Sequence, residues 1–139
     1  MATKIYLAGA CYNEPDEGRA WREKATEILK QVESWVDKNV VVINPTQYFS
    51  YSENKHKTHK QVKNFYMNKI RNCDLVLCNL NNSAASVGTG QEVQFAVDHH
   101  IPVIGFGTEN VYPWIEEVDC DVVFSNMVEA IDYIRDYYL

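Results

Sequence analysis

Apolar residues gather in five short runs, separated by longer segments whose apolar positions recur at helical spacing. The runs are rich in β-branched residues and apolar at successive positions, which is typical of parallel strands covered by helices on both faces. They span residues 5–8, 40–43, 75–80, 101–106 and 122–124. Their alternation with helical segments predicts an α/β fold, a single doubly wound domain of the flavodoxin-like or Rossmann-like kind with about five parallel strands.

Four helices are predicted between and after these runs. The first begins near Asp16 or Glu17, and its apolar stripe is formed by Ala20, Trp21, Ala25, Ile28, Leu29 and Val32. The others are expected at residues 57–72, 90–99 and 127–138. Residues 46–55 are polar and aromatic without periodicity, so we expect a loop that acts as a lid. A chain of 139 residues has the usual size of one domain, which we expect to span residues 1–139.

Charge and hydropathy narrow the choice of partners. Nineteen acidic and thirteen basic side chains give a formal charge of -6, so no field attracts a nucleic-acid backbone or an anionic membrane. No apolar run approaches the roughly 18 residues of a membrane helix, and the first run is too short for a secretory signal. We therefore expect a soluble, cytoplasmic protein that binds a small molecule, with neither nucleic acid nor membrane as a partner.

Neither the cysteines nor the histidines have the spacing of a metal site. The thiols are scattered, and we expect them to be reduced and to act as small apolar residues; they are Cys11, Cys73, Cys78 and Cys120. Cys11 follows a predicted strand, where a reactive thiol is the alternative. The histidines lie in polar surroundings, at His56, His59, His99 and His100. The sequence therefore predicts no metal ion and no cofactor.

Residues 79–92 follow the third predicted strand, and ligands of open α/β sheets bind at the carboxyl ends of strands. This segment is rich in small residues, contains Gly88 and Gly90, and leads into a helix with Glu92 in its predicted first turn. A helix N-terminus holds an anion or keeps a carboxylate ionised. We therefore expect Glu92 to be negatively charged at neutral pH, as a nucleophile requires. The alternative is that Glu92 only stabilises its own helix.

Five sequence elements occur together in the order and spacing of a known family. They are residues 4–9 (KIYLAG), 21–22 (WR), 43–45 (INP), 73–77 (CDLVL) and 86–92 (SVGTGQE). Together they resemble the nucleoside 2-deoxyribosyltransferases and their relatives, the deoxynucleoside 5′-monophosphate N-hydrolases. The resemblance extends to about Phe106. It implies an enzyme of nucleotide metabolism or salvage that binds a nucleoside or nucleotide and a free base, without a cofactor.

The resemblance also implies roles for individual residues. Glu92 would attack C1′ of the deoxyribose and form a covalent glycosyl-enzyme, which a second base or water resolves with net retention. Tyr6, at the end of the first strand, would hydrogen-bond and orient Glu92; a half-buried structural tyrosine is the alternative. Gly9 and Asn44, which follow the first two strands, are further candidate substrate contacts. The implied activity is transfer of the sugar of a 2′-deoxynucleoside to another base.

Ser86 departs from the pattern of the transferases. The resemblance implies an aspartate here in enzymes that act on free nucleosides, and a serine that contacts the 5′-phosphate in the monophosphate hydrolases. A hydroxyl beside the N–H groups of Gly88 and Gly90 can bind a phosphate without charge repulsion. Arg19 and Arg22 are candidate cationic partners, or else lie on a solvated helix face. Ser86 therefore supports a 2′-deoxynucleoside 5′-monophosphate N-glycosidase as the alternative function.

The group that assists the leaving base is the second departure. The resemblance implies an aspartate about eight residues before Asp74, and that register holds Tyr66. Asp74 begins its strand and so lies about 17 Å from the carboxyl edge, which favours a structural role. Tyr66, Asn68 or a residue of another loop then contacts the base, or turnover is slow. A catalytically weak nucleotide-binding module is therefore a third alternative.

Aromatic residues are dense near the end of the chain. They are Tyr112, Trp114, Tyr133, Tyr137 and Tyr138. Because aromatic residues are enriched in interface cores, we expect a homo-oligomer, a dimer or higher, in which residues 110–114 or 133–139 close the neighbour's pocket. Asn110 is the candidate that reaches across. The alternative is that these rings only pack the last helix on the sheet.

Overall fold

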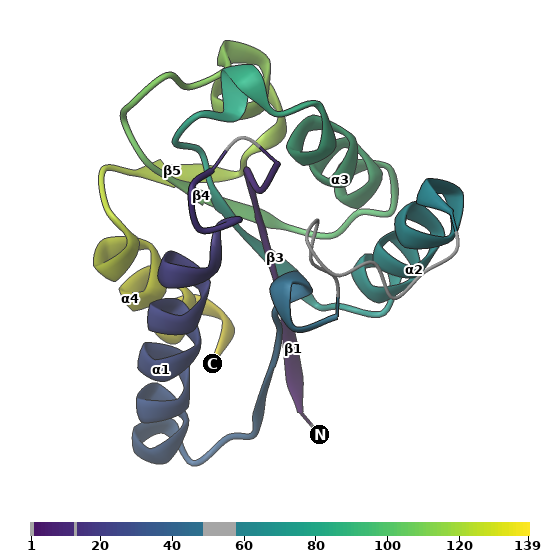
Figure 1. The fold of residues 1–139 in the computed structure, drawn as a ribbon. Helices are drawn as coiled ribbons and strands as arrows, with labels where there is room; N and C mark the ends of the chain where they lie inside the picture. Colours follow the sequence, from purple (N-terminus) through teal and green to yellow (C-terminus); the bar gives the residue numbers. More distant parts are fainter. Residues whose placement is uncertain (1, 13, 49–57) are drawn as a thin grey trace.

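The computed structural model describes residues 2–12, 14–48 and 58–139. Within these ranges the strands form one five-stranded sheet in the order β2-β1-β3-β4-β5 (Figure 1). The strands are β1 (Thr3–Gly9), β2 (Val40–Ile43), β3 (Leu75–Asn79), β4 (Val103–Phe106) and β5 (Val122–Phe124). Every neighbouring pair is parallel. The predicted doubly wound α/β fold is confirmed, and its strand order is that of the flavodoxin-like type.

Helices cover both faces of this sheet, which explains why the strand sequences are apolar at successive positions. The helices are α1 (Arg19–Val36), α2 (His59–Arg71), α3 (Val87–Asp98) and α4 (Met127–Tyr138). The short helices are η1 (Pro45–Gln47), η2 (Ser83–Ala85) and η3 (Trp114–Asp119). The last helix has the predicted bounds. None of the described helices is long and apolar enough to cross a membrane.

Three helices begin at residues other than those predicted, and α2 differs by two residues, beginning at His59. The helix α1 begins at Arg19 because the Asp16 carboxylate accepts the backbone N–H groups of Gly18 and Ala20 and holds a turn in front of the helix. The helix α3 begins at Val87, three residues earlier than predicted, because the Ser86 hydroxyl accepts the Thr89 N–H and caps it. Consequently Glu92 lies in the second turn of α3.

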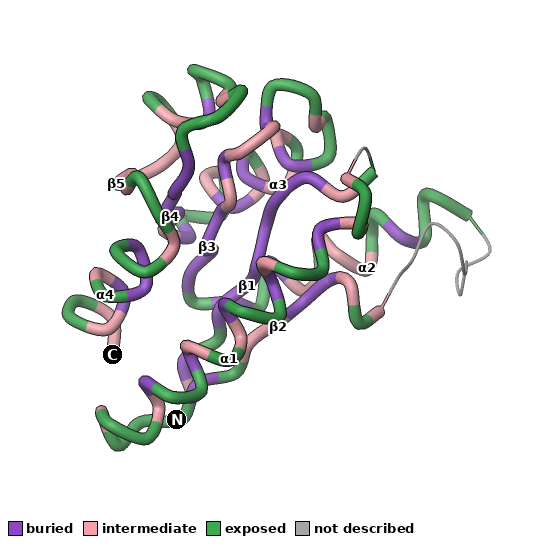
Figure 2. The backbone as a smooth tube through the Cα atoms, turned by 60° about the vertical axis from the view of Figure 1, so that its left-hand side comes forward, coloured by how far each residue is buried: buried purple, intermediate pink, exposed green. Residues whose placement is uncertain are grey.

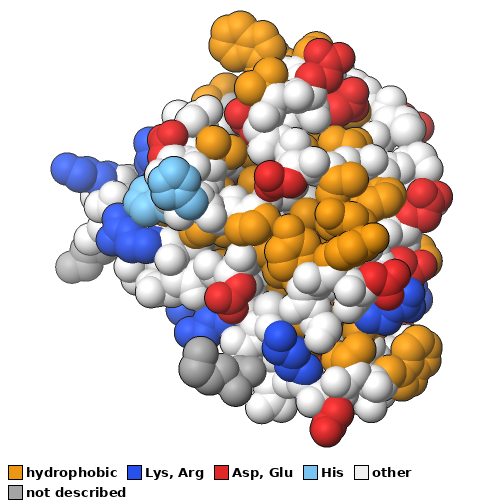
Figure 3. Space-filling view, turned by 180° about the vertical axis from the view of Figure 1, so that it is seen from behind, with side chains coloured by type: hydrophobic (Ala, Val, Ile, Leu, Met, Phe, Trp, Pro, Cys, Tyr) orange, Lys and Arg blue, Asp and Glu red, His pale blue; other side chains and the backbone are white. Residues whose placement is uncertain are grey.

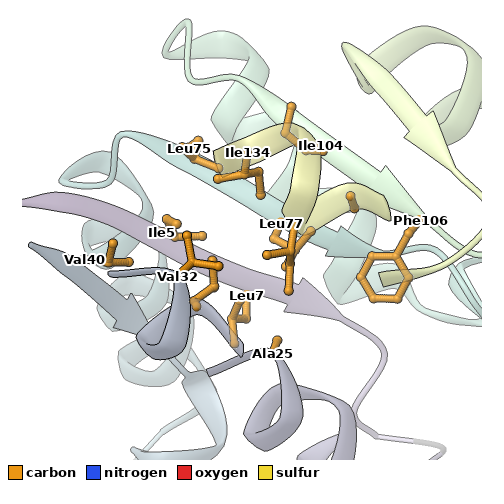
Figure 4. Close-up of a cluster of buried hydrophobic side chains, with 13 residues drawn as sticks. Ile5, Leu7, Ala25, Val32, Val40, Leu75, Leu77, Ile104, Phe106 and Ile134 are labelled. Atoms are coloured by element: carbon orange, nitrogen blue, oxygen red, sulfur yellow. The ribbon is translucent and has the colours of Figure 1, made fainter. Parts of the chain in front are cut away.

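The sheet separates two hydrophobic cores. On one face α1 and α4 pack on the strands, and their contacts include Val32 and Ile134 (Figure 4). On the other face α2 and α3 pack through Ile70, Val93 and Ala96. The central strands β1 and β3 are buried between these layers, as the tube in Figure 2 shows. The carboxyl ends of the central strands are therefore held by two independent packed layers.

Smaller predictions about the loops and thiols have mixed outcomes. The start of the predicted lid forms the short helix η1, and the rest of it, with His56, lies outside the described residues. Cys73 and Cys78 are buried, Cys11 and Cys120 are partly buried, and all four are free thiols. Ala20, predicted in the apolar stripe of α1, is exposed instead.

Candidate active site

A cavity of about 780 Å³ opens at the carboxyl ends of β1 and β3. The strand order reverses between these two strands, which is where doubly wound sheets bind their ligands. Its walls come from the β1–α1 loop, the start of η1, the helix α2, the β3–α3 loop and the first turns of α3. The volume is that of a pocket for one small molecule.

Glu92 and Tyr6 meet at this cavity. Glu92 projects from the second turn of α3 and contributes to the lining. Tyr6 is fully buried in β1, and its hydroxyl donates a hydrogen bond to Oε2 of Glu92. The two residues are 86 positions apart in the sequence. The structure thus brings together the predicted nucleophile and its predicted orienting tyrosine. The Tyr6 hydrogen bond is made to Oε2 of Glu92 and not to Oε1.

The protonation of Glu92 differs from the expectation. Burial raises the pKa of Glu92 to about 7, although the Tyr6 hydrogen bond and the charge of Arg22 lower it. The helix end does not keep Glu92 ionised, because the stabilisation by a helix terminus fades within the first turn and Glu92 lies beyond that turn. Glu92 is therefore about half ionised at neutral pH. Burial, and then the Glu92 charge, raise the pKa of Tyr6, so its phenol remains a donor.

Arg22 does not lie on a solvated helix face, the alternative considered from the sequence. It is buried beside the cavity, and its guanidinium donates to three backbone carbonyls. These are Leu7 at 3.2 Å, Gly9 at 2.8 Å and Gly18 at 2.9 Å. The Arg22 side chain is therefore not in solvent, and its guanidinium is anchored to backbone carbonyls beside the cavity. Arg19 is exposed, pairs with Glu17 at 3.1 Å and lies outside the cavity lining.

The glycines and Ser86 have separate roles. Ser86 lines the cavity, but its hydroxyl is already bonded to Thr89 Oγ1 at 2.7 Å as part of the cap of α3. Gly88 faces open space, since an added Cβ would meet no atom within 4 Å. Gly9 lines the cavity, and an added Cβ would come within 2.9 Å of Trp21. Gly90 lies outside the lining. The first turn of α3 is therefore the part of this segment that a ligand can approach closely.

The remaining predicted residues are divided between the cavity and other parts of the structure. Tyr66 lines the cavity, and its hydroxyl donates to the Pro45 carbonyl at 3.1 Å. Asn44 is buried outside the lining and caps η1 by accepting the Thr46 N–H at 3.0 Å. Asn68 is exposed and does not line the cavity. Asp74 accepts the Lys4 N–H at 2.8 Å at the opposite end of the sheet, as its structural role predicts.

Several cavity residues were not singled out from the sequence. Glu14 accepts the Asn82 side-chain N–H at 2.8 Å and so ties the β1–α1 loop to the β3–α3 loop. Both follow predicted strands, so the rule for strand ends was the signal that pointed to them. His59 and Lys63 lie four positions apart on α2, at the spacing of one helix face. That spacing was visible in the sequence, but only the tertiary structure turns the face toward the cavity.

The aromatic residues near the chain end divide into two groups. Tyr133 and Tyr138 are partly buried against the core under α4, which agrees with simple packing of the last helix. Trp114 and Tyr137 are 70% and 72% exposed. Hydrophobic side chains also gather on the face of the molecule seen in Figure 3. Asn110 is exposed, and its carbonyl accepts the Ala84 N–H at 3.1 Å, away from the cavity of its own chain.

Across the described residues, no group of three or more His, Cys, Asp or Glu side chains could hold a metal ion. The cavity lining contains three carboxylates, a buried arginine, and the basic side chains of His59 and Lys63, and the Tyr6 hydroxyl is bonded to one of these carboxylates, Glu92. The carboxylates are Glu14, Glu17 and Glu92. Such a set can bind a polar small molecule and perform chemistry at a carboxylate oxygen.

The family comparison and a solved structure both relate this chain to 2-deoxyribosyltransferases. Residues 5–129 match the sequence profile of the family described as nucleoside 2-deoxyribosyltransferase. A 2-deoxyribosyltransferase from Leishmania mexicana has a similar structure, with a TM-score of 0.71, 21% identity, and 99% of each chain covered. A search by sequence among curated proteins gives no match.

Two further solved structures share the fold. The 2-deoxyribosyltransferase of Bacillus psychrosaccharolyticus has a TM-score of 0.69 and 20% identity, covering 94% of this chain and 90% of that one. A conserved protein from Enterococcus faecalis V583 has a TM-score of 0.64 and 16% identity, covering 97% and 87%. At such identities the likeness concerns the fold, and the family is shown by the profile match.

Proposed function

The chain belongs to the nucleoside 2-deoxyribosyltransferase family, and we propose that it cleaves the N-glycosidic bond of a 2′-deoxynucleoside and transfers the sugar to another base. The observation that carries this proposal is the hydrogen bond from Tyr6 to Glu92 at the cavity. It fixes one oxygen of a buried carboxylate at a place where a small molecule fits. A carboxylate held in this way is suited to nucleophilic attack.

The proposed reaction has two displacements. In the first, Oε1 of ionised Glu92 attacks C1′, the C1′–N bond breaks, and its electron pair leaves with the base, which takes up a proton from solvent. In the second, a nitrogen of the incoming base attacks C1′ from the opposite side, loses its N–H proton to solvent, and releases Glu92 as a carboxylate. Two inversions give net retention at C1′, as in retaining glycoside cleavage. Tyr6 holds Oε2 throughout and orients the attacking oxygen.

We assign the two walls of the cavity to two parts of the substrate. Glu92 must lie next to C1′, so the sugar lies against α3. The base then faces α2, which contributes the apolar and aromatic side chains of Val62, Tyr66 and Met67 to the lining. Such side chains suit a flat heterocycle. Tyr66, His59 and Lys63 are the groups on this wall that can hydrogen-bond the leaving base.

A deoxynucleoside 5′-monophosphate is the second candidate substrate. The first turn of α3 favours it, because Val87 and Gly88 line the cavity there and the N–H groups of a first helical turn bind phosphate well. Gly88 leaves this approach open. Gly88 also lies one helical turn before Glu92, about 6 Å along the axis, so one ligand can contact both. With water in place of the second base, the same two steps constitute an N-glycosidase.

A substrate panel tests the function and separates the alternatives. The chain is incubated with deoxyinosine plus adenine, and separately with each deoxynucleoside monophosphate, while free bases and new nucleosides are followed by chromatography. New deoxyadenosine supports transfer, and base release from monophosphates alone supports the hydrolase. Ligand-dependent thermal stabilisation without any product over hours would instead identify a binding module and overturn the proposed reaction.

Ser86→Asp is the matching test of phosphate recognition. It places a carboxylate at the cap of α3, beside the proposed phosphate position. Like charges about 4 Å apart cost several kcal/mol at a partly buried site. The ratio of monophosphate to nucleoside activity should therefore fall if monophosphates are bound there. Ser86→Asn keeps a capping side chain without the charge and is the control. An unchanged ratio in both variants would place the phosphate elsewhere.

We also propose that the active form is a homo-oligomer in which a second copy covers the exposed Trp114 and Tyr112. Their rings lie 6.0 Å apart on the surface, and exposed aromatic pairs of this kind are typical of interface cores. Light scattering at assay concentration measures the mass. A mass near 16.0 kDa with full activity would rule this assembly out, whereas a dimer or larger that dissociates in Trp114→Ser would support it.

A further inference from the structure

We propose that Arg22 is a positioning residue for the reaction, because its buried guanidinium is the fixed countercharge that favours the ionised form of the Glu92 carboxylate in the cavity. The inference rests on the proposed role of Glu92 as nucleophile. It gives a function to a buried cation that the two displacement steps do not themselves use.

Arg22 reaches the site from the other face of the sheet. It belongs to α1, which packs on the face opposite α2 and α3 (Figure 1). Its side chain extends over the carboxyl end of β1, where Leu7 and Gly9 accept its hydrogen bonds. It thereby contributes to the lining of the same cavity as Cys11 and Glu92. The guanidinium is thus fixed by the strand that carries Tyr6.

The charge of Arg22 is not neutralised by its own hydrogen bonds. Its three identified acceptors are backbone carbonyls, which are uncharged. No ion pair in the described part of the chain includes Arg22. An arginine keeps its proton in proteins, and fully buried charges normally have an opposite charge nearby. A carboxylate near this cation therefore gains stability that an isolated buried carboxylate lacks.

The charged groups around the cavity leave Glu92 as the buried carboxylate that needs this charge. In the β1–α1 loop, Glu17 is paired with Arg19, and the exposed Asp16 is bonded to two backbone N–H groups, which lower its pKa more than Arg22 does. Glu14 is bonded to Asn82. Around Glu92 itself lie Tyr6 of β1, the thiols of Cys11 and Cys78, and Arg22. Arg22 is the cation among them, and it lowers the pKa of Glu92 against the effect of burial.

The absence of a direct ion pair between Arg22 and Glu92, both of which are described, is compatible with this role. A guanidinium bonded to Oε1 would occupy the lone pairs that attack C1′ and would hold the carboxylate away from the sugar. A cation held at a distance by carbonyl groups stabilises the negative charge through space and leaves the oxygen accessible. The anchoring carbonyls therefore fix the charge in the lining of the cavity that also contains Glu92.

The unmodified chain supplies the first test. The Nε–H group of Arg22 is buried and bonded to Leu7, so its ¹⁵N–¹H signal is protected from exchange. This signal should shift with pH with a midpoint near 7, as Glu92 titrates, and the titration should vanish in Glu92→Gln. A signal that does not respond to pH in the unmodified chain would overturn the inference. This readout is independent of turnover, so it also holds if the proposed reaction is wrong.

Two substitutions supply the second test. Arg22→Gln and Arg22→Lys both lose part of the guanidinium bonding, but only the lysine keeps the charge. The Glu92 carboxyl signal, followed by ¹³C NMR, should titrate on the order of one pH unit higher in Arg22→Gln and close to the unmodified chain in Arg22→Lys. The rising limb of base release should move by the same amount. Activity lost at pH 6.5 should then recover at pH 9 in Arg22→Gln.

Lys24→Gln is the matched control, since it removes one positive charge from the exposed side of the same helix. Its pH profile should match that of the unmodified chain. A uniform loss of activity in both Arg22 variants at every pH, with no shift of the Glu92 titration, would assign Arg22 a purely structural role. If Arg22→Gln does not fold, the pH response of the Arg22 signal in the unmodified chain still decides the question.

Discussion

The two edges of the sheet use carboxylates in opposite ways. At the amino edge, three exposed or partly exposed carboxylates accept the N–H groups that begin strands: Asp74 from Lys4, Glu33 from Val40 and Asp121 from Val103. At the carboxyl edge, Glu92 is bonded to a buried phenol instead. The same functional group is thus a strand cap at one edge and a candidate nucleophile at the other.

The difference in surroundings decides the charge of each group. The Val40 N–H lowers the pKa of Glu33, because a backbone donor stabilises the ionised form in contact with solvent. Burial raises the pKa of Glu92 to about 7. The charged form of Glu33 therefore stabilises the fold, whereas the charged form of Glu92 destabilises it. Stability is given up at the carboxyl edge, where the proposed chemistry takes place.

The largest expected effect is the loss of activity in Glu92→Gln. The amide keeps the shape of the side chain and removes the nucleophilic oxygen anion, so base release should fall by at least about a thousandfold. Ligand binding, measured as thermal stabilisation by a nucleoside, should persist. Activity within tenfold of the unmodified chain would show that the nucleophile lies elsewhere and would remove the contrast between the two edges.

Tyr6→Phe should have the next largest effect. It removes the hydrogen bond to Oε2 and leaves the ring in the core. We expect base release to fall roughly tenfold to a hundredfold, as for the loss of one hydrogen bond that orients a reacting group. The pKa of Glu92 should also rise, since that bond lowers it. Steady-state kinetics across pH measure both effects. A variant that matches the unmodified chain would make Tyr6 structural.

The pH dependence should have opposite signs for rate and stability. Base release should rise with pH through about 7, as Glu92 becomes ionised. Because the folded pKa of Glu92 is raised, its contribution to stability is complete below the unfolded value of 4.5 and is lost as pH rises through about 7. The loss is on the order of 3 kcal/mol. Denaturant unfolding at pH 5 and pH 8 measures it, with Glu92→Gln as the control that lacks this slope.

The smallest effect is expected at the amino edge. Asp74→Ala removes the acceptor of the Lys4 N–H, and we expect a loss of about 1 kcal/mol in the free energy of unfolding. Base release per folded molecule should stay within about twofold, because this edge lies a full strand length from the cavity. Denaturant titration and single-substrate kinetics check the two parts. A large loss of activity with unchanged stability would contradict the structural role of Asp74.

The position of the site was predictable from the pattern of apolar runs along the sequence. The protonation of Glu92 in that site was not predictable in this way. The apolar runs marked all five strands, and the segments that follow them contain most of the residues that line the cavity. The family resemblance assigned Glu92 and Tyr6 before the structure placed them in contact. The start of α3 was misplaced by three residues, because the Ser86 cap competes with two glycines that weaken the pattern. Because of that error Glu92 was placed in the first turn of α3, and it was therefore expected to be fully ionised.

The sequence by itself determined the fold class, since apolar periodicity is a local property that each strand and helix expresses separately. It also determined which segments lie at strand ends, because a parallel doubly wound sheet puts them at one edge. Only the tertiary structure decided that Arg22 is buried against carbonyl groups and that Glu92 titrates near neutral pH. Burial and electrostatic interactions depend on atoms from several segments at once, and no single segment of the sequence contains that information.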